Sequence, residues 1–134
     1  MDVTLNKVVA ACEKHWDKYK TDCSGFAKAV AEDFGIVLTG QANDIVDQIQ
    51  KQPWQLLKSG FEASNKAGAG LVVAGLKGAP LGHVAIVVSG PLASGKYPTA
   101  YWGQLGGVGK KQTTLNWSWN KSDRDKVIYA VRSI

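Results

Sequence analysis

One stretch decides the fold class of this 134-residue chain: Gly82-His83-Val84-Ala85-Ile86-Val87-Val88. It is short, apolar and rich in β-branched residues, which is typical of a buried strand. Other apolar or β-branched runs lie on either side of it, at 70–74, 100–102, 113–119 and 126–132. Clusters of Gly, Pro and Ser separate these runs and mark turns. The second half of the chain is therefore predicted to form an antiparallel sheet.

The first half of the chain has helical spacing instead. Five apolar residues recur every three or four positions and predict one amphipathic helix: Leu5, Val8, Cys12, Trp16 and Tyr19. A second helix is predicted over 23–34, and a third, capped by Thr39, ends before Pro53. Helices followed by strands predict an α+β fold with the helices packed on the sheet. The length fits a single domain over residues 1–134.

The composition excludes several classes of protein. Hydrophobic residues make up 45% of the chain, which is too many for a disordered protein. Two cysteines are too few for a small protein whose fold is held together by disulfides. No apolar run approaches the roughly 20 residues of a membrane span, and the first residues lack the pattern of a signal peptide. We therefore expect no membrane span, and a chain made in the cytoplasm that no signal peptide of its own exports.

The charge points to a basic surface. The net charge is +5, from 16 basic and 11 acidic residues, and such a surface can attract nucleic acid, anionic lipid or an anionic wall polymer. The basic residues are scattered, however, and their densest groups lie at 14–20 and 110–111. Because no block of like charge forms, we read the charge as a solvated surface and expect no nucleic-acid partner.

The stretch that is most informative about chemistry is Thr21-Asp22-Cys23-Ser24-Gly25-Phe26. It places Cys23 in the first turn of a predicted helix, where free backbone N–H groups and the helix dipole favour a thiolate. The same N–H groups can contribute to an oxyanion hole. We expect Asp22, Ser24 and Gly25 to border this cleft, with Gly25 leaving room for a substrate. The alternative is a buried, inert cysteine.

His83 strengthens the first interpretation, because it begins the most strand-like run. If the Cys23 helix packs on the sheet, His83 can take the thiol proton and later return it to a leaving amine. The alternative is a histidine at a strand edge with no function. His15 neighbours the apolar stripe of the first helix and is interpreted as structural or peripheral, and Cys12 is interpreted as a core residue.

A third group usually fixes the tautomer of such a histidine. Gln104 follows the next predicted strand and carries the only amide there, so it is the candidate. Tyr101 or a backbone carbonyl are alternatives. The chain has no C-x-x-C or H-x₃₋₅-H spacing and no glycine-rich phosphate loop. We therefore expect neither a metal nor another cofactor.

The two stretches together, Asp22 to Phe26 and Gly82 to Val87, resemble the NlpC-type cell-wall peptidases and their amidase relatives, a papain-like superfamily. The order of Cys, His and a polar residue on the next strand matches that family. The resemblance implies a papain-like fold and cleavage of peptides in peptidoglycan by a Cys–His pair without a metal. The family often has His at the third position, where this chain offers Gln104.

A further segment, Phe34 to Asn43, lies between the cysteine helix and the sheet. With the absence of a wall-binding module, it makes the chain similar to the small amidase effectors of type VI secretion, and to the third of those families. That resemblance implies four properties: synthesis in the cytoplasm, delivery by the type VI apparatus, action in the target's periplasm, and a cognate periplasmic immunity protein. It also implies cleavage of the cross-link between diaminopimelate and D-Ala, with the bond between D-Glu and the diamino acid as the other choice.

Two other functions stay open at this point. A housekeeping or phage-derived wall hydrolase would share the chemistry without the secretion system. A non-enzymatic basic module could bind nucleic acid or wall polymer, although the pairing of Cys23 with His83 argues against it.

Overall fold

The computed structural model describes the backbone of residues 3–134 and the surroundings of the side chains from residue 7 onward. Three helices come first: α1 (Val3–Tyr19), α2 (Cys23–Glu32) and α3 (Ala42–Ile49). The remaining elements are β1 (Gln55–Leu57), α4 (Gly60–Lys66), β2 (Gly70–Leu76), β3 (His83–Val87), β4 (Thr99–Trp102), β5 (Lys110–Thr114), the 3₁₀ helix η1 (Leu115–Trp117) and β6 (Ile128–Ser133). Within residues 3–134, no helix has the length and apolar character needed to cross a membrane.

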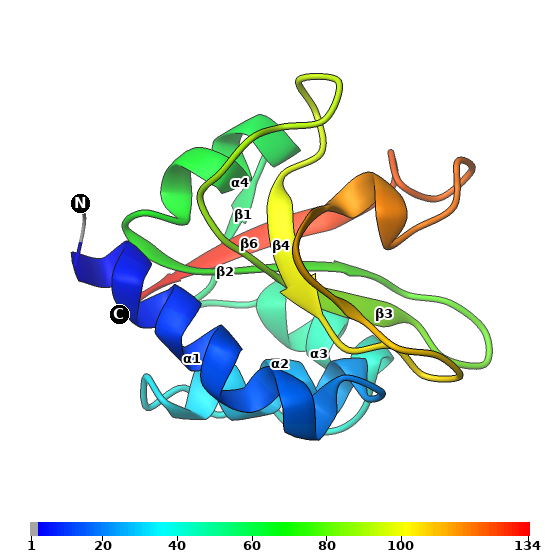
Figure 1. Ribbon diagram of the computed structural model, residues 1–134, viewed down its shortest axis with the longest axis horizontal. Helices are drawn as coiled ribbons and strands as arrows, with labels where there is room; N and C mark the ends of the chain where they lie inside the picture. The colour runs from blue at the N-terminus through cyan, green and yellow to red at the C-terminus, as the bar shows by residue number, and fades with distance from the viewer. Residues whose placement is uncertain (1–2) are drawn as a thin grey trace.

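The strands form one six-stranded sheet in the order β1-β6-β2-β3-β4-β5, and the neighbouring strands are antiparallel (Figure 1). The predicted α+β fold is confirmed. The central strand β2 is buried along nearly its whole length, because both faces of the sheet are covered.

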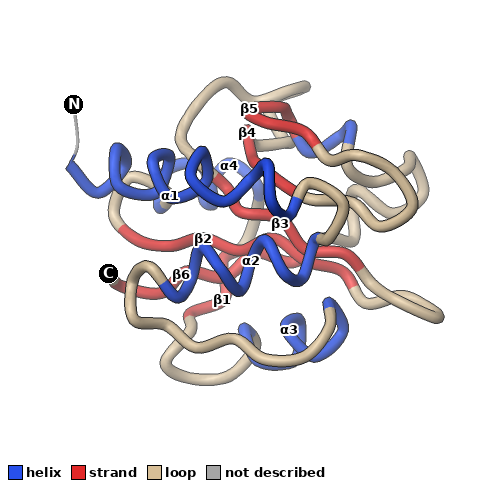
Figure 2. Tube along the Cα trace, turned by 60° about the horizontal axis from the view of Figure 1, so that its bottom comes forward, coloured by secondary structure: helices blue, strands red, loops and turns tan. Residues whose placement is uncertain are grey.

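Each face of the sheet has its own core, since successive side chains of a strand point to opposite faces. Leu71 and Val73 of β2 join the core made with α1, α2 and α3, which lie together on one side of the strands (Figure 2). Val72 and Ala74 join the second core, with α4 and η1. Full burial of each Val or Leu contributes about 1.5–3 kcal/mol. The helices are therefore not confined to one face, as α4 covers the other.

Four details differ from the sequence-based expectation. The strand β1 and the helix α4 were not predicted, because β1 is short and largely exposed and α4 leaves Phe61 57% exposed. The run 113–119 is wrong as a strand, since β5 ends at Thr114 and η1 follows. Thr39 is also wrong as a helix cap. Helix α3 begins at Ala42, and the Asp44 carboxylate accepts a hydrogen bond from the backbone N–H of Gln41.

Candidate active site

Cys23 is the first residue of α2, and the residue before it holds the helix end in place. One carboxylate oxygen of Asp22, Oδ1, accepts hydrogen bonds from the backbone N–H of Gly25 at 3.0 Å and from the hydroxyl of Ser24 at 3.1 Å. This is the side-chain cap that a helix N-terminus requires. It leaves the backbone N–H groups of Cys23 and Ser24 close to the thiol.

The Cys23 side chain is only 2% exposed, and the raised pKa of its thiol favours the protonated form near pH 7. Burial raises the pKa of the thiol, and the negative charge of Asp22 raises it further. Hydrogen bonds from the backbone of Val84, Ser24 and Cys23 itself act in the opposite direction. We expected the helix end to lower the pKa of the thiol and so favour a thiolate. Burial has the larger effect and raises the pKa instead. The bond from Val84 shows that the sulfur lies against the start of β3.

His83 begins β3, and its ring is held on two sides. Its Nε2 lies 2.6 Å from the hydroxyl oxygen of Ser118. The ring also packs edge-on against Trp119, with the ring centres 4.8 Å apart. Burial lowers the pKa of His83 to about 4. The imidazole is therefore neutral near pH 7 and available to accept a proton.

A cavity of about 280 Å³ brings the predicted residues together. Its walls are formed by Cys23, Leu81, Gly82, His83, Gln104, Leu105 and Ser118. The thiol comes from the start of α2 and the imidazole from the start of β3, with two loops between them. Larger hollows of the surface lie elsewhere, over α1 and α2 and beside α4, and neither contains both a cysteine and a histidine.

The loop 103–109 carries Gln104 to the cavity. The backbone carbonyl of Lys20 accepts hydrogen bonds from the N–H groups of Gln104 at 3.1 Å and of Gly109 at 2.7 Å. Gly103 permits this close approach, because a Cβ there would collide with the Tyr19 carbonyl. Among the described residues, the ring nitrogen Nε2 of His83 has its hydrogen bond with Ser118 and not with Gln104.

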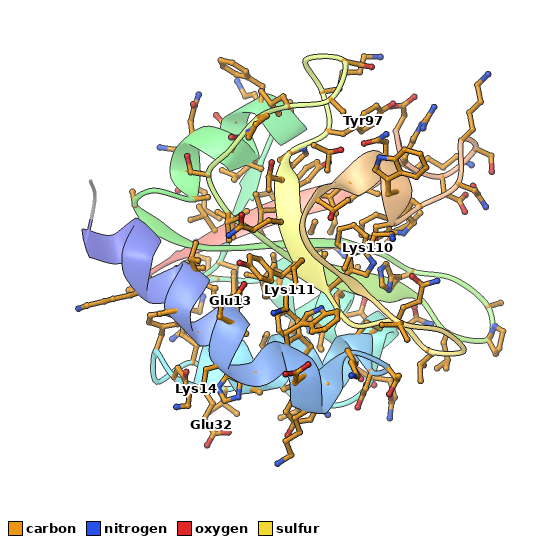
Figure 3. The ribbon with its side chains drawn as sticks, viewed as in Figure 1. Glu13, Lys14, Glu32, Tyr97, Lys110 and Lys111 are labelled. Carbon is orange, nitrogen blue, oxygen red and sulfur yellow. The ribbon has the colours of Figure 1, made fainter. Side chains whose placement is uncertain are left out.

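Tyr101, the alternative to Gln104, lies on the face of the sheet that α1 covers. Its hydroxyl donates to the carboxylate of Glu13 and accepts from the amide of Gln112. Glu13 also pairs with Lys111 at 3.0 Å, and Figure 3 shows these two side chains reaching toward each other from α1 and β5. Tyr101 therefore joins a helix to the edge of the sheet and does not line the cavity.

Two of the expected cleft residues have packing roles in the structure. A Cβ at Gly25 would collide with the Asp22 carboxylate and the Tyr19 ring, so this glycine allows the helix end to fit; it is not among the residues that line the cavity. The Ser24 hydroxyl donates to the side-chain oxygens of Asp22 and Gln41. Outside the site, His15 pairs with Asp33 on the surface, at 3.1 Å between Nε2 and Oδ2.

Neither cysteine is in a disulfide, and Cys12 is fully buried in the helical core. Residues 3–134 contain no cluster of three or more His, Cys, Asp or Glu side chains that could hold a metal ion. What the site does contain is a thiol, a neutral imidazole and the N-terminal N–H groups of a helix. These are the parts of a nucleophilic acyl-transfer site.

Comparison with known proteins bears on what such a site acts on. No family model matches the chain. The peptidoglycan amidase Tse1 of Pseudomonas aeruginosa is 43% identical to it over 146 residues, and the match covers 100% of this chain and 94% of the relative. Membership of the NlpC-type superfamily, and of the third family of type VI amidase effectors, stays a prediction. The similarity covers the whole length of the chain, which therefore belongs to the family of the peptidoglycan amidase Tse1.

Proposed function

We propose that this chain is a peptidoglycan amidase in which Cys23 is the nucleophile and His83 the general base. One observation carries the proposal: the cavity that joins the thiol to the imidazole lies in a chain that is 43% identical to a peptidoglycan amidase. The cysteine and the histidine come from opposite halves of the chain, and the packing of α2 on β3 brings them to one cavity.

The geometry supports a two-step hydrolysis. His83 takes the proton of the Cys23 thiol while the sulfur attacks the carbonyl carbon of the peptide bond. The N–H groups of Cys23 and Ser24 stabilise the oxyanion, and His83 then gives its proton to the leaving amine. This leaves a thioester on Cys23. A water molecule, activated by His83, attacks the thioester, releases the new carboxylate and returns the proton to the thiol.

The resting protonation states suit this mechanism. A neutral thiol beside a neutral imidazole transfers its proton only when the substrate is attacked. Because water is largely excluded from a buried pair, the N–H groups act there with little competition. The cost is that the thiol is a weak nucleophile until the base acts.

We further propose that the enzyme is delivered to other bacteria as an antibacterial effector. The resemblance of the chain to type VI amidase effectors supports this role, and the relative's name supports peptidoglycan as the substrate. In that role the type VI apparatus carries the enzyme to the periplasm of a target cell, and a cognate periplasmic immunity protein protects the producer. The exposed apolar side chains that line the cavity, Leu81 and Leu105, offer such a partner a docking surface. The basic charge of +5 favours an acidic one.

The test is a digest of purified peptidoglycan with the intact protein, followed by mass analysis of the released peptides. We expect fragments that carry a new amine and a new carboxylate at one peptide bond. The fragment masses also decide between the cross-link, which the resemblance implies, and the bond between D-Glu and the diamino acid. Intact peptidoglycan after prolonged digestion by the folded protein would contradict the proposal.

A further inference from the structure

The ring of His83 has a hydrogen-bond partner that the sequence did not indicate. Ser118 lies 35 residues further along the chain, and its hydroxyl oxygen is 2.6 Å from Nε2 of the ring. That is short for a nitrogen-to-oxygen hydrogen bond. With Nε2 occupied in this way, Nδ1 is the ring nitrogen that is left to take a proton from Cys23.

The position of Ser118 is set by the segment that follows β5. Leu115 is 1% exposed and anchors this segment in the second core. The backbone N–H of Ser118 then donates to the Leu115 carbonyl at 2.9 Å and closes the 3₁₀ turn of η1. Trp119, the next residue, packs against the His83 ring. The turn therefore delivers a hydroxyl and an aromatic edge to the same imidazole.

The chemistry distinguishes two tautomers of His83. If Nε2 carries the proton, it donates to Ser118, and the lone pair of Nδ1 is free to accept the thiol proton. If Nδ1 carries the proton, Ser118 donates to Nε2 and His83 cannot act as the base toward Cys23. Only the first tautomer supports the hydrolysis proposed above.

We infer that Ser118 is a positioning residue that holds His83 in the tautomer with the proton on Nε2, so that Nδ1 faces Cys23 as the base. The part of this inference that concerns catalysis rests on the proposed function. Gln104 lines the cavity as well, but from the loop that Lys20 anchors. It is therefore better placed to contact a substrate than to orient the ring.

A neutral partner also has a consequence for the pH dependence. The walls of the cavity that face His83 carry no charge: they are the thiol of Cys23, two leucines, a glycine, an amide and the hydroxyl of Ser118. The charge of Asp22 acts on the Cys23 thiol, whereas burial alone shifts the pKa of His83. A carboxylate in place of the hydroxyl would stabilise the imidazolium and raise the pKa of His83. The hydroxyl orients the ring without doing so.

The first test is spectroscopic and needs no turnover. The chain has only two histidines, so the imidazole nitrogens of ¹⁵N-labelled protein can be assigned by NMR. We expect the wild type to show the Nε2–H tautomer for His83, and Ser118→Ala to show a mixture of tautomers with His15 unchanged. The Nδ1–H tautomer in the wild type would overturn the inference, even if the protein proves to be an amidase.

The second test is kinetic, with soluble peptidoglycan fragments as substrate. Loss of one neutral hydrogen bond predicts that Ser118→Ala lowers kcat about 3- to 10-fold with KM unchanged. Ser118→Thr keeps the hydroxyl and should retain most of kcat, whereas Ser118→Asp should move the acid limb of the pH profile upward.

Ser122→Ala is the matched control, because that hydroxyl is exposed and donates to Asn120. It should leave both kinetic constants unchanged. If Ser118→Ala keeps the wild-type kcat, or if Ser118→Asp leaves the acid limb where it was, Ser118 does not position the base. If the wild type itself hydrolyses nothing, the proposed function fails, and the tautomer measurement still decides the role of Ser118.

Discussion

Burial shifts the pKa of both side chains of the proposed catalytic pair. It raises the pKa of the Cys23 thiol and lowers that of His83 to about 4. Near pH 7 the pair is therefore neutral, with the proton on sulfur. In the proposed mechanism, the reaction depends on transfer of this proton to His83 as the substrate is attacked, so each of the two residues needs the other.

His83→Ala should reduce hydrolysis nearly as much as loss of the nucleophile. Removal of a general base costs about 10²- to 10⁴-fold, and residues that act as a unit do not give additive losses. The measurement is the rate of release of peptides from purified peptidoglycan. His15→Ala is the control, because that ring pairs with Asp33 on the surface. Equal rates for the two alanine variants would show that His83 is not the base.

At the scale of the element, the N-terminus of α2 combines two opposing influences on the thiol. The helix needs a side-chain cap, and Asp22 supplies it with a charge that raises the pKa of Cys23. An asparagine caps a helix about as well as an aspartate. The cap and the charge can therefore be separated by substitution.

Asp22→Asn should lower the pKa of the Cys23 thiol while the fold stays as stable as the wild type. Asp22→Ala removes the cap as well and should cost about 1 kcal/mol of unfolding free energy. The pKa is measured from the pH dependence of alkylation of the thiol, and the stability from urea unfolding. An unchanged or higher thiol pKa in Asp22→Asn would contradict this account of the helix end.

The same element shows how far sequence carries the prediction. The helix start at Cys23 and the strand start at His83 could be predicted, because a cap residue and a β-branched run are local signals. The partner of His83 could not, since Ser118 reaches it only after the chain has crossed β4 and β5. A serine at that distance carries no local signal. Gln104 was favoured because it directly follows the neighbouring strand.

The segment 113–119 shows the same limit. Its threonines and tryptophans have strand propensity, yet the chain turns into η1 once Leu115 enters the second core. Tertiary packing overrides propensity at such a position. The capping box of α3 was a local signal that could have been found, as Gln41 and Asp44 have the required spacing.

At the scale of the whole molecule, the buried neutral state of His83 makes stability depend on pH. The folded-state pKa of about 4 lies below the ordinary value of 6.5, so the unfolded chain binds this proton more readily. The contribution of neutral His83 to the free energy of unfolding is fully present above pH 6.5 and is lost as the pH falls toward 4. The difference between these two pKa values corresponds to about 3 kcal/mol of unfolding free energy.

Urea unfolding at pH 7 and pH 4 measures this term. Between pH 7 and pH 4, we expect the free energy of unfolding to fall by about 3 kcal/mol more in the wild type than in His83→Ala. Glu13, whose pKa is lowered by its bonds to Tyr101 and Lys111, also weakens the fold in acid. It is present in both proteins, so its effect cancels. Identical losses in the two proteins would show that His83 is not buried in its neutral form.

The cavity also defines where an inhibitor would act. The segments 78–82 and 103–109 contribute to its walls, and the side-chain amide of Asn43 holds the first of these segments through hydrogen bonds with Gly78. A cognate acidic partner that covers this opening should protect Cys23 from alkylation, with Cys12 fully buried in either state. Full reactivity of Cys23 in a saturated complex would place the partner elsewhere.

The central claim is that Cys23 attacks the peptide bond. The most direct test is to quench the enzyme with acid during turnover of soluble peptidoglycan fragments and to measure the mass of the intact protein by mass spectrometry. We predict a mass adduct equal to the acyl part of the substrate on the wild type. Cys23→Ala, folded and otherwise unchanged, should show neither adduct nor hydrolysis. Release of the same fragments at a similar rate by folded Cys23→Ala would contradict the claim.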